Sequence, residues 1–358
     1  MSKEFSYKDL VAFHPGSYVE DIIEDLNITQ FEFAERVGTS SKTISKIING
    51  EENISVDLAN KLAKLTGISI KTWINLQRNY DIKVMEIKNL QDEDEKRACD
   101  LTDISYFKQN NFLEDKRYSS KEKISELRKL LNISSLSNLF EFNSAVSYRT
   151  TQAFTDRSIV NSNIMLELAT DIAKDKTGNS YKKRKLNEVL PIIRKMTLES
   201  PDDFYPKLKE LLLQCGIVLV GLPNLKNARL QGATKKFKNG SVLLLITDRN
   251  KRSDIFWFSL IHELGHIYYE EFYSNYEDHD SYNEKEKRAD QFALDFFIPS
   301  EYYNDFINAG DFSKDAIMSF SKELNLHPSI LVGRMQKDKY IKFSEFNYLK
   351  ENYGFQLI

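Results

Sequence analysis

The sequence is poor in cysteine, in net charge and in long apolar runs. Cys99 and Cys215 are the only cysteines among 358 residues, which argues against a disulfide framework and against a zinc site built from thiolates. The formal net charge is −3, so no overall basic field indicates a nucleic-acid or membrane partner. The most apolar runs, Ile217–Val220 and Val242–Ile246, are far shorter than the roughly 20 residues that span a bilayer.

The N-terminal residues also lack the pattern of a secretory signal. Met1–Val11 is polar and mixed in charge, without the apolar segment that such a signal needs. We therefore expect a cytoplasmic protein with no membrane partner. The 41% of hydrophobic and 29% of charged residues are typical of a soluble globular protein, and the length allows two or three separate cores.

The first part of the chain, to about residue 80, predicts several short helices. Thr29 stands three residues before Glu32, which suits a capping box, and Gly38 then ends that helix. Ser40 or Ser41 can cap the next helix. Its expected buried face consists of Ile44, Ile47 and Ile48. A fourth helix is expected from about Val56 to Gly67.

The middle of the chain is less informative. Between residues 81 and 120 the periodicity loosens, and Gln91–Arg97 is a dense run of charge, which predicts a solvated helix face or a linker. Helical periodicity returns from about 121 to 195, where the basic stretch Lys182–Lys185 is interpreted as an exposed helix face rather than a nucleic-acid patch. We expect residues 81–195 to form a helical linker region.

The C-terminal part predicts strands followed by helices. Ile217–Leu222 and Ser241–Thr247 are short β-rich runs, and Arg229–Phe237 alternates well enough to be a third strand. Helices are expected over Ser253–Glu271 and Asn283–Phe297. The pattern indicates an α+β fold over residues 196–358 rather than a doubly wound parallel sheet.

One of these helices carries an H-E-x-x-H pattern, His262-Glu263-Leu264-Gly265-His266. Two histidines four residues apart lie one turn apart on one helix face, so both imidazoles can reach one metal ion. Glu263 can then touch a metal-bound water and accept its proton. The alternative is a pair of buried histidines bonded to backbone. With five histidines in the chain, a chance match to the pattern is roughly a half-per-cent event. Gly265, which costs helix propensity, predicts close packing against this helix.

A tetrahedral catalytic zinc needs a third protein ligand and an open position. Tyr269 and Phe272 stand where a metzincin needs glycine and histidine, so that class is excluded. Glu286 lies in the next helix with Asp290 four residues later, so the glutamate can bind metal while the aspartate accepts the outer N–H of a ligand histidine. This arrangement follows the gluzincin pattern. His279, Asp280 and Glu284 are competing ligands.

These residues resemble a known family. Phe256–His266 is similar to the core of the ImmA/IrrE-type metallopeptidases, and Glu286–Ala293 followed by Phe297-Ile298-Pro299 is similar to that family's second motif. Gly232-Ala233-Thr234 matches the strand before the motif helix. Arg288 stands where the family often has a further acidic residue, so no role is carried to it. The resemblance covers Asp203–Tyr340 and implies zinc-dependent peptidase chemistry.

The N-terminal segment resembles a second family over Phe13–Tyr80. The segments His14-Pro15-Gly16, Thr29–Arg36 and Lys42–Gly50 are similar to a HigA-type Xre/Cro helix-turn-helix. The run with Trp73, Leu76, Gln77 and Tyr80 resembles its closing helix. His327–Arg334 is similar to the tail of the peptidase subgroup that is fused to such a domain, whereas Ser147-Tyr148-Arg149 matches only loosely. Members of the family include proteases that cleave repressors and antitoxin-like regulators of toxin operons.

In a helix-turn-helix the second helix enters the major groove with its N-terminal residues at the base edges. Here that helix is about Ser40–Ile48, and its outward side is expected to carry Ser41, Lys42, Thr43 and Lys46. Gln30 opens the preceding helix, where it can meet a phosphate. Residues 1–80 hold nine basic and eleven acidic side chains, so non-specific DNA affinity should be weak. The alternative is a helical bundle used for dimerisation or partner binding.

Several other polar residues are candidates for structural or catalytic roles. His14 beside Pro15 is interpreted as a helix-entry residue, and His327 before Pro328 as structural. Tyr273 and Tyr276 are candidate donors to an oxyanion. His279 is interpreted as an exposed loop residue rather than a transition-state donor.

The sequence therefore predicts an α+β multidomain protein with three parts: an all-α helix-turn-helix domain over 1–80, the helical linker region over 81–195 and a gluzincin-like metallopeptidase domain over 196–358. We expect a DNA-binding transcriptional regulator fused to a Zn²⁺-dependent endopeptidase that cuts a repressor-type protein or itself. Its partners would be double-stranded operator DNA and a protein substrate or partner, a repressor or a toxin, with a homodimer left open. The alternative is an antitoxin-like repressor whose peptidase fold serves partner binding. Residues 81–120 are the expected tether between the two functions.

Overall fold

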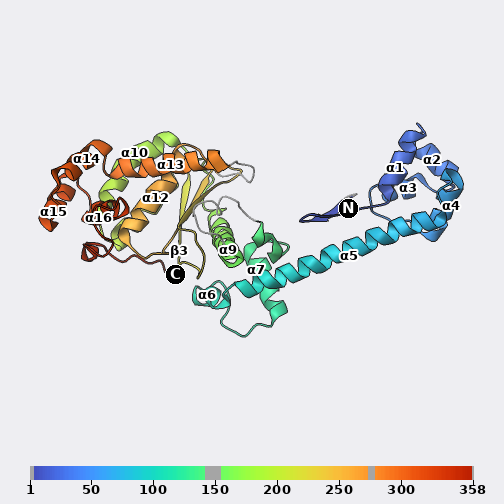
Figure 1. Ribbon diagram of the computed structural model, residues 1–358, viewed down its shortest axis with the longest axis horizontal. Coiled ribbons are helices and arrows are strands. Elements are labelled where there is room, and N and C mark those ends of the chain that lie inside the picture. Colours follow the sequence, from blue (N-terminus) through green and yellow to red (C-terminus); the bar gives the residue numbers. More distant parts are fainter. Residues whose placement is uncertain (1–3, 142–154, 273–278, 357–358) are drawn as a thin grey trace. The chain divides into compact units, whose positions relative to one another are not determined.

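The computed structural model describes residues 4–141, 155–272 and 279–356 (Figure 1). The contacts divide the chain into two compact units, residues 1–95 and 96–358. This division falls fifteen residues beyond the boundary expected at residue 80, and helix α5 (Ile70–Leu101) runs through both places. Within the described residues, no helix is both long and apolar enough to cross a membrane.

The N-terminal unit contains the expected short helices, and their ends lie where the sequence places them. These are α1 (Gly16–Asp25), α2 (Gln30–Val37), α3 (Ser41–Ile48) and α4 (Val56–Thr66). The Thr29 hydroxyl accepts the Glu32 N–H at 3.2 Å, and Gly38 ends α2 in the left-handed conformation. The Ser40 hydroxyl caps α3 in the same way by accepting the Thr43 N–H at 3.0 Å. The predicted N-caps of α2 and α3 are therefore confirmed, but the reciprocal bond of a capping box is not formed at α2, because the Glu32 carboxylate accepts from the Arg36 guanidinium instead.

Two further residues fix the packing of this unit. Trp73 of α5 is fully buried in its core, as expected for a closing helix, and the Gln77 amide oxygen accepts the Ile54 N–H at 2.9 Å. A Cβ at Gly16 would lie 1.9 Å from the carbonyl oxygen of Ile47, so α1 and α3 meet at a distance that only glycine allows.

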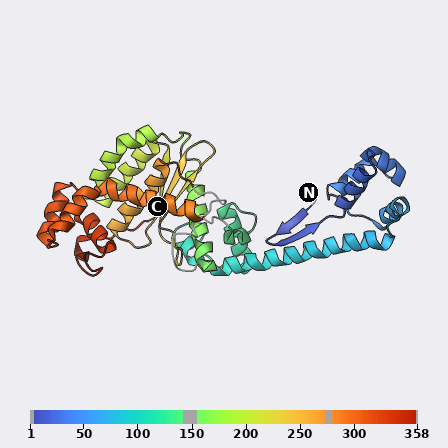
Figure 2. The ribbon, with the colours of Figure 1, turned by 45° about the horizontal axis from the view of Figure 1, so that its top comes forward.

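A β-hairpin precedes these helices. Strands β1 (Glu4–Tyr7) and β2 (Leu10–Phe13) pair antiparallel with Tyr7 opposite Leu10. Figure 2 shows the hairpin beside α5, and Tyr7, Ala12 and Ile87 form its buried core. The expectation of an all-α N-terminal region overlooks this hairpin, because two four-residue strands are too short to show a clear alternation.

Helix α5 is continuous across the charged run that predicted a loosened region. Asp94 and Glu95, inside that run, are both buried, and the Lys8 ammonium lies 2.5 Å from the Asp94 carboxylate. The chain is therefore helical as far as Leu101, which agrees with the expected helix rather than the open linker, but Asp94 and Glu95 are buried and not solvated as expected. Helix α6 (Ile104–Gln109) follows, and residues 102–103 and 110–119 of this segment lack regular secondary structure.

The C-terminal unit is built on a mixed three-stranded sheet in the order β3-β5-β4 (Figure 1). β3 (Ile217–Leu222) is parallel to β5 (Val242–Thr247), and β4 (Gly232–Lys236) is antiparallel to it. All three strands lie within the expected ranges, and the fold is α+β as predicted.

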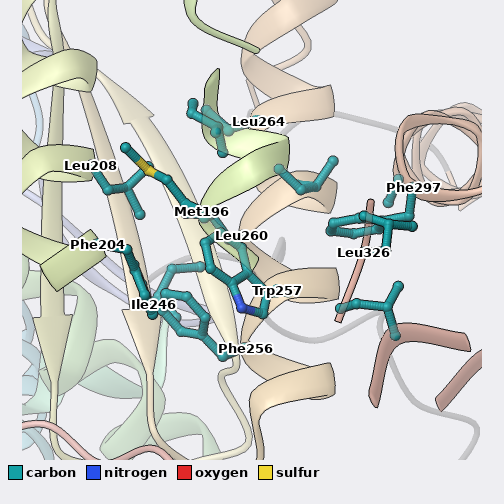
Figure 3. Packing of buried hydrophobic residues seen from close by; sticks show 14 of the residues in the cluster. Met196, Phe204, Leu208, Ile246, Phe256, Trp257, Leu260, Leu264, Phe297 and Leu326 are labelled. Carbon is teal, nitrogen blue, oxygen red and sulfur yellow. The ribbon is translucent and has the colours of Figure 1, made fainter. Parts of the chain in front are cut away.

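Side chains alternate between two cores on the two faces of this sheet. Ile217, Leu219 and Leu244 face one core, whereas Val218 and Leu243 face the other. On the first face lie α10 (Lys183–Lys195), α11 (Pro201–Gln214) and α12 (Ser253–Tyr268). Figure 3 shows this packing, with Trp257 of α12 beside Phe204 of α11 at a ring-centroid distance of 4.7 Å.

The second face is covered by residues of the region expected to be a linker. Its helices are α6, α7 (Ser120–Leu131) and α9 (Asp156–Ala173), with the 3₁₀ segment η1 (Leu136–Phe140). The Tyr106 hydroxyl of α6 donates to the Pro223 carbonyl after β3 at 2.7 Å. The helical content agrees with the expectation, but residues 96–195 pack as part of the C-terminal core. We therefore propose that this domain begins near Lys96.

The remaining elements follow the sheet. They are η2 (Met196–Leu198), α13 (His279–Phe297), α14 (Ser300–Ala309), α15 (Lys314–Glu323), α16 (Pro328–Lys337) and η3 (Asn347–Leu349). The His327 ring nitrogen Nδ1 accepts the Ser329 N–H at 3.3 Å and caps α16, which is the structural role expected of it.

Candidate metal centre and candidate nucleic-acid interface

Helix α12 carries the H-E-x-x-H residues inside the core. Its apolar side chains pack on the sheet and on neighbouring helices, because the segment is apolar on most of its circumference. His262, Glu263 and His266 are only 4%, 1% and 0% exposed. Polar groups at such depth need partners, and the neighbouring helix supplies them to the two histidines.

Helix α13 lies beside α12 (Figure 1) and approaches it closely at Gly265. A Cβ added to Gly265 would lie 3.2 Å from the Cα of Ala289 and 3.2 Å from the Phe292 ring. The close packing predicted from this glycine is therefore confirmed. It brings Glu286 and Asp290, one turn apart on α13, up to the two histidines.

Three side chains converge on one point. His262 Nε2 and His266 Nε2 are 3.1 Å apart, and the Glu286 carboxylate lies 3.5 Å from the first nitrogen and 3.3 Å from the second. Two ligands held about 2.05 Å from one ion at the tetrahedral angle lie about 3.3 Å apart. The three observed distances lie around this value, so the residues fit a small tetrahedral ion. Within the described chain, His262, His266 and Glu286 form a group able to hold a metal.

Asp290 orients one of these ligands. Its Oδ1 lies 2.8 Å from His262 Nδ1, so a proton on Nδ1 leaves the Nε2 lone pair directed at the metal position. Burial raises the pKa of Asp290, but the hydrogen bond and charge of His262 and the charge of Lys337 outweigh it and hold that pKa below its usual value. The carboxylate therefore stays ionised and polarises the imidazole.

Lys337 was not anticipated from the sequence. It lies in α16, its ammonium is 3.6 Å from Asp290 Oδ2, and it sits 4.5 Å from the centre of the Phe258 ring. Forty-seven residues separate it from Asp290, and no local pattern relates the two. A basic residue at the end of a helix gave no signal by which this contact could have been found.

Glu263 faces strand β4 at Gly232. A Cβ at residue 232 would lie 2.6 Å from Glu263 Cγ and 2.8 Å from Oε1. The backbone of this edge strand therefore runs directly against the glutamate, beside the metal position. This is the place from which Glu263 can reach a water bound there.

Of the three competing ligand candidates, the structure describes the side chains of two, Asp280 and Glu284. Asp280 and Glu284 are exposed, and neither belongs to the group of side chains that converge. Tyr273 and Tyr276 lie outside the described residues, and the side chain of His279 does too. Arg288 donates to Glu271 at 2.5 Å on the surface.

Helix α3 presents the expected polar side. Ile44, Ile47 and Ile48 are buried, whereas Lys42 is exposed and Lys46 is half-buried. The Thr43 hydroxyl lies 2.9 Å from the Ser40 hydroxyl within the cap, so part of its bonding capacity is used locally. Ser41 opens this helix and Gln30 opens α2, both half-buried.

The two lysines of this helix differ in electrostatic setting. The Lys46 ammonium lies 3.7 Å from the Glu52 carboxylate, and this acidic neighbour opposes the approach of a phosphate. Lys42 makes no ion pair within the described part of the chain. The contact of Glu52 with Lys46 was not expected from the sequence, because Glu52 lies beyond the end of the helix.

Comparison with known proteins finds a family match in each of the two units. Residues 19–73 match the family described as "Helix-turn-helix", and residues 226–320 match the "IrrE N-terminal-like domain" of peptidases. The chain joins an Xre/Cro-like helix-turn-helix to an IrrE/ImmA-like metallopeptidase domain. It is thus a DNA-binding regulator fused to a metallopeptidase-like domain.

Similar proteins are found for the regulator's N-terminal part. An uncharacterised HTH-type transcriptional regulator of Escherichia coli, YddM, is 28% identical over 72 residues, which are 20% of this chain and 77% of that protein. A putative antidote protein of a plasmid maintenance system from Nostoc punctiforme is 38% identical over 26% of this chain and 98% of its own, with a TM-score of 0.22. A HigA-family addiction module antidote protein from Coxiella burnetii is 31% identical over 24% and 92%, also with a TM-score of 0.22.

Proposed function

We propose that the C-terminal domain is a zinc-dependent endopeptidase and that the regulator uses it to cut a repressor-type protein or its own chain. The observation that carries this proposal is the triangle of His262, His266 and Glu286, whose ligand atoms lie within 4.8 Å of one another. Such a set leaves one tetrahedral position open, as catalytic zinc sites do. A structural site would need a fourth protein ligand, and the described residues add none to this group.

A bound zinc ion would lower the pKa of its water towards 7 and polarise the scissile carbonyl. Glu263 accepts the proton of the attacking water and passes it to the leaving amine. Its burial and its contact with Gly232 fix the position of the carboxylate. Asp290 holds His262 in the tautomer that presents Nε2.

The cleavage site in the chain itself would lie within residues 110–119. This stretch has no regular structure, and Glu114, Asp115, Lys116 and Arg117 are exposed. Proteases need such an extended, accessible backbone. The helices on either side, α6 and α7, and α5 before them use their backbone groups in helical hydrogen bonds, so the rest of the expected tether is a poor substrate.

The N-terminal part is proposed to bind an operator through Gln30, Ser41, Lys42, Thr43 and Lys46. The support is the exposed polar side of α3, opposite its buried isoleucines. A palindromic operator would require a homodimer, which we also propose. A toxin or a repressor is the proposed protein partner.

The alternative is an antitoxin-like repressor whose peptidase fold docks a partner without turnover. Glu263→Gln separates the two. This change keeps the size of the side chain and the metal ligands but removes the base, so zinc content should stay at one ion per chain while cleavage falls by about 10²–10⁴-fold.

Metal is measured by mass spectrometry on protein purified without chelator, and cleavage by following the chain and co-purified partners. His262→Ala and His266→Ala should each lose the zinc. Full zinc in these variants would reject the ligand assignment. Absence of cleavage by wild type under every inducing condition, with zinc bound, would favour the docking alternative.

A further inference from the structure

A cavity of about 520 Å³ lies in the C-terminal domain among α12, α13 and α16. Its size suits a whole small molecule, because ligand pockets in proteins span roughly 300–1,000 Å³. The proposed metal ligands do not line it, so the cavity is separate from the triad itself.

The cavity nevertheless begins next to the metal centre. Phe258 and Ser259 line it and precede His262 and Glu263 by four residues, which is about one helical turn. Leu294 lines it from α13 and follows Asp290 by one turn in the same way. The Phe258 ring centre is 6.3 Å from that of His262. The two helices that hold the proposed metal therefore also form the walls of the cavity.

The lining combines apolar walls with an excess of positive charge. Apolar side chains come from all three helices, for example Ile255, Leu294 and Ile330. The buried Asp254 and Lys350 neutralise each other at 2.5 Å. Three further cations line the cavity. They are Arg252, Arg334 and Lys337.

Arg252 is the cation best placed to receive a ligand. It donates a hydrogen bond to a neutral group, the Asn347 amide oxygen, at 2.8 Å, and it forms no ion pair within the described residues. Arg334 instead donates to the Ile298 carbonyl at 2.6 Å and covers the Tyr303 ring. A guanidinium without a carboxylate beside an apolar wall recognises an anion.

We propose that this cavity binds a small amphipathic anion, a carboxylate, sulfonate or phosphate on an apolar body, and that its occupancy is linked to metal binding. The anionic group is attracted by the cations of the lining, Arg252 and Lys337 among them, and the apolar body lies against Ile255 and Ile330. The linkage rests on the proposed metal site, whereas the binding site does not.

The linkage follows from one chain of contacts. Lys337 is 3.6 Å from Asp290, and Asp290 is 2.8 Å from His262. An anion beside Lys337 offsets its charge, so more of the negative field of Asp290 acts on His262 and favours a cation at its Nε2. By reciprocity, a bound metal must strengthen anion binding by the same factor.

The binding site is tested with a matched pair of fluorescent probes on the full chain. 1-Anilinonaphthalene-8-sulfonate carries the charge, and N-phenyl-1-naphthylamine has the same rings without it. We expect one sulfonate site per chain, at least tenfold tighter than the neutral probe. Arg252→Gln should weaken the sulfonate several-fold and leave the neutral probe unchanged. Leu294→Trp should fill the cavity and abolish both, whereas Leu213→Trp on α11 should change neither.

The linkage is tested by repeating the sulfonate titration with zinc. Zinc should tighten binding at least threefold, and Lys337→Gln should remove most of that gain while zinc still binds. Equal affinity for both probes, or binding that survives Leu294→Trp, would overturn the site. A cleaved peptide that displaces the sulfonate at its own KM would make the cavity a substrate subsite, which also overturns the proposal. If the chain holds no zinc, the endopeptidase proposal and the linkage fail, and the zinc-free titration still decides the binding site.

Discussion

Gly232 leaves no room for a methyl group beside Glu263. The Cβ of any other residue at position 232 would lie 2.6 Å from Glu263 Cγ, well inside van der Waals contact. The strand and the buried glutamate therefore fit together only because residue 232 has no side chain, and the position of the proposed base depends on this glycine.

Gly232→Ala should displace Glu263 without disturbing the metal ligands. A shift of about 1 Å in a reacting group can cost about 10²-fold in rate, so we expect a loss of cleavage of this order with zinc content retained. Gly178→Ala is the matched control, because a Cβ there meets nothing within 4 Å. Wild-type turnover by Gly232→Ala would show that Glu263 is not the base.

Asp290→Ala should weaken zinc binding about 10–100-fold, since it removes the carboxylate that orients and polarises His262. The affinity is measured by competition with a chromogenic chelator. Asp295→Ala, an exposed aspartate on the same helix, should bind zinc as wild type does. Equal affinities for the two variants would contradict the role given to Asp290.

Lys42→Ala should weaken operator binding more than Lys46→Ala does. Glu52 already offsets the charge of Lys46 at 3.7 Å, whereas Lys42 is exposed. Loss of one phosphate contact should lower the slope of log affinity against log salt by about 0.9, measured by gel-shift titration at several salt concentrations. Lys64→Ala on α4 is the control. Unaltered affinity and slope in Lys42→Ala would reject α3 as the reading helix.

The N-terminal unit should lose stability as the pH falls below about 6.5. Burial lowers the pKa of His14 from its ordinary value of 6.5, and its Nδ1 accepts the Gly16 N–H at 3.0 Å. The unfolded chain therefore binds a proton below pH 6.5 that the folded chain does not, and stability decreases until the folded pKa is passed.

Trp73 reports this unit alone in a Trp257→Phe background, because the chain has two tryptophans. Urea unfolding is followed by its fluorescence at pH 7.5 and 5.5. His14→Gln cannot titrate, so the advantage of wild type over this variant should be smaller at the lower pH. An advantage that is constant with pH would show that His14 is not the group responsible.

The sequence predicts best what depends on neighbouring residues. The caps of α2 and α3 and the two histidines on one helix face follow from residue spacing within one or two helical turns. The three strands follow from short runs of apolar or alternating residues. Glu286 could be chosen only because Asp290 follows it at four residues, which limits the choice of helix face. Two contacts could not be predicted in this way: that of Lys337 with Asp290 and that of Lys46 with Glu52. They depend on how separate segments of the chain pack or turn, and no local sequence pattern predicts that.

In helix α5 the local pattern itself was misleading. Its residues 91–97 are charged enough to resemble a linker, because periodicity measures apolar residues alone. Here the buried positions include Asp94 and Glu95, and Asp94 is bonded to Tyr7 and Lys8 of the hairpin. The contact between α5 and the hairpin is partly polar, so it leaves no periodic pattern of apolar residues in the sequence. The buried face of this part of α5 was missed for that reason.

The sheet with two cores limits how the protein can be taken apart. Five large aliphatic side chains, Val218, Val220, Leu222, Leu243 and Leu245, face the helices of residues 96–173 and are at most 6% exposed. A peptidase fragment that begins at residue 196 would present this surface to water and should aggregate. A fragment that begins near residue 96 keeps it covered. Any experiment that separates cleavage from DNA recognition by truncation should therefore cut within α5, and a loss of activity after cutting later reports misfolding.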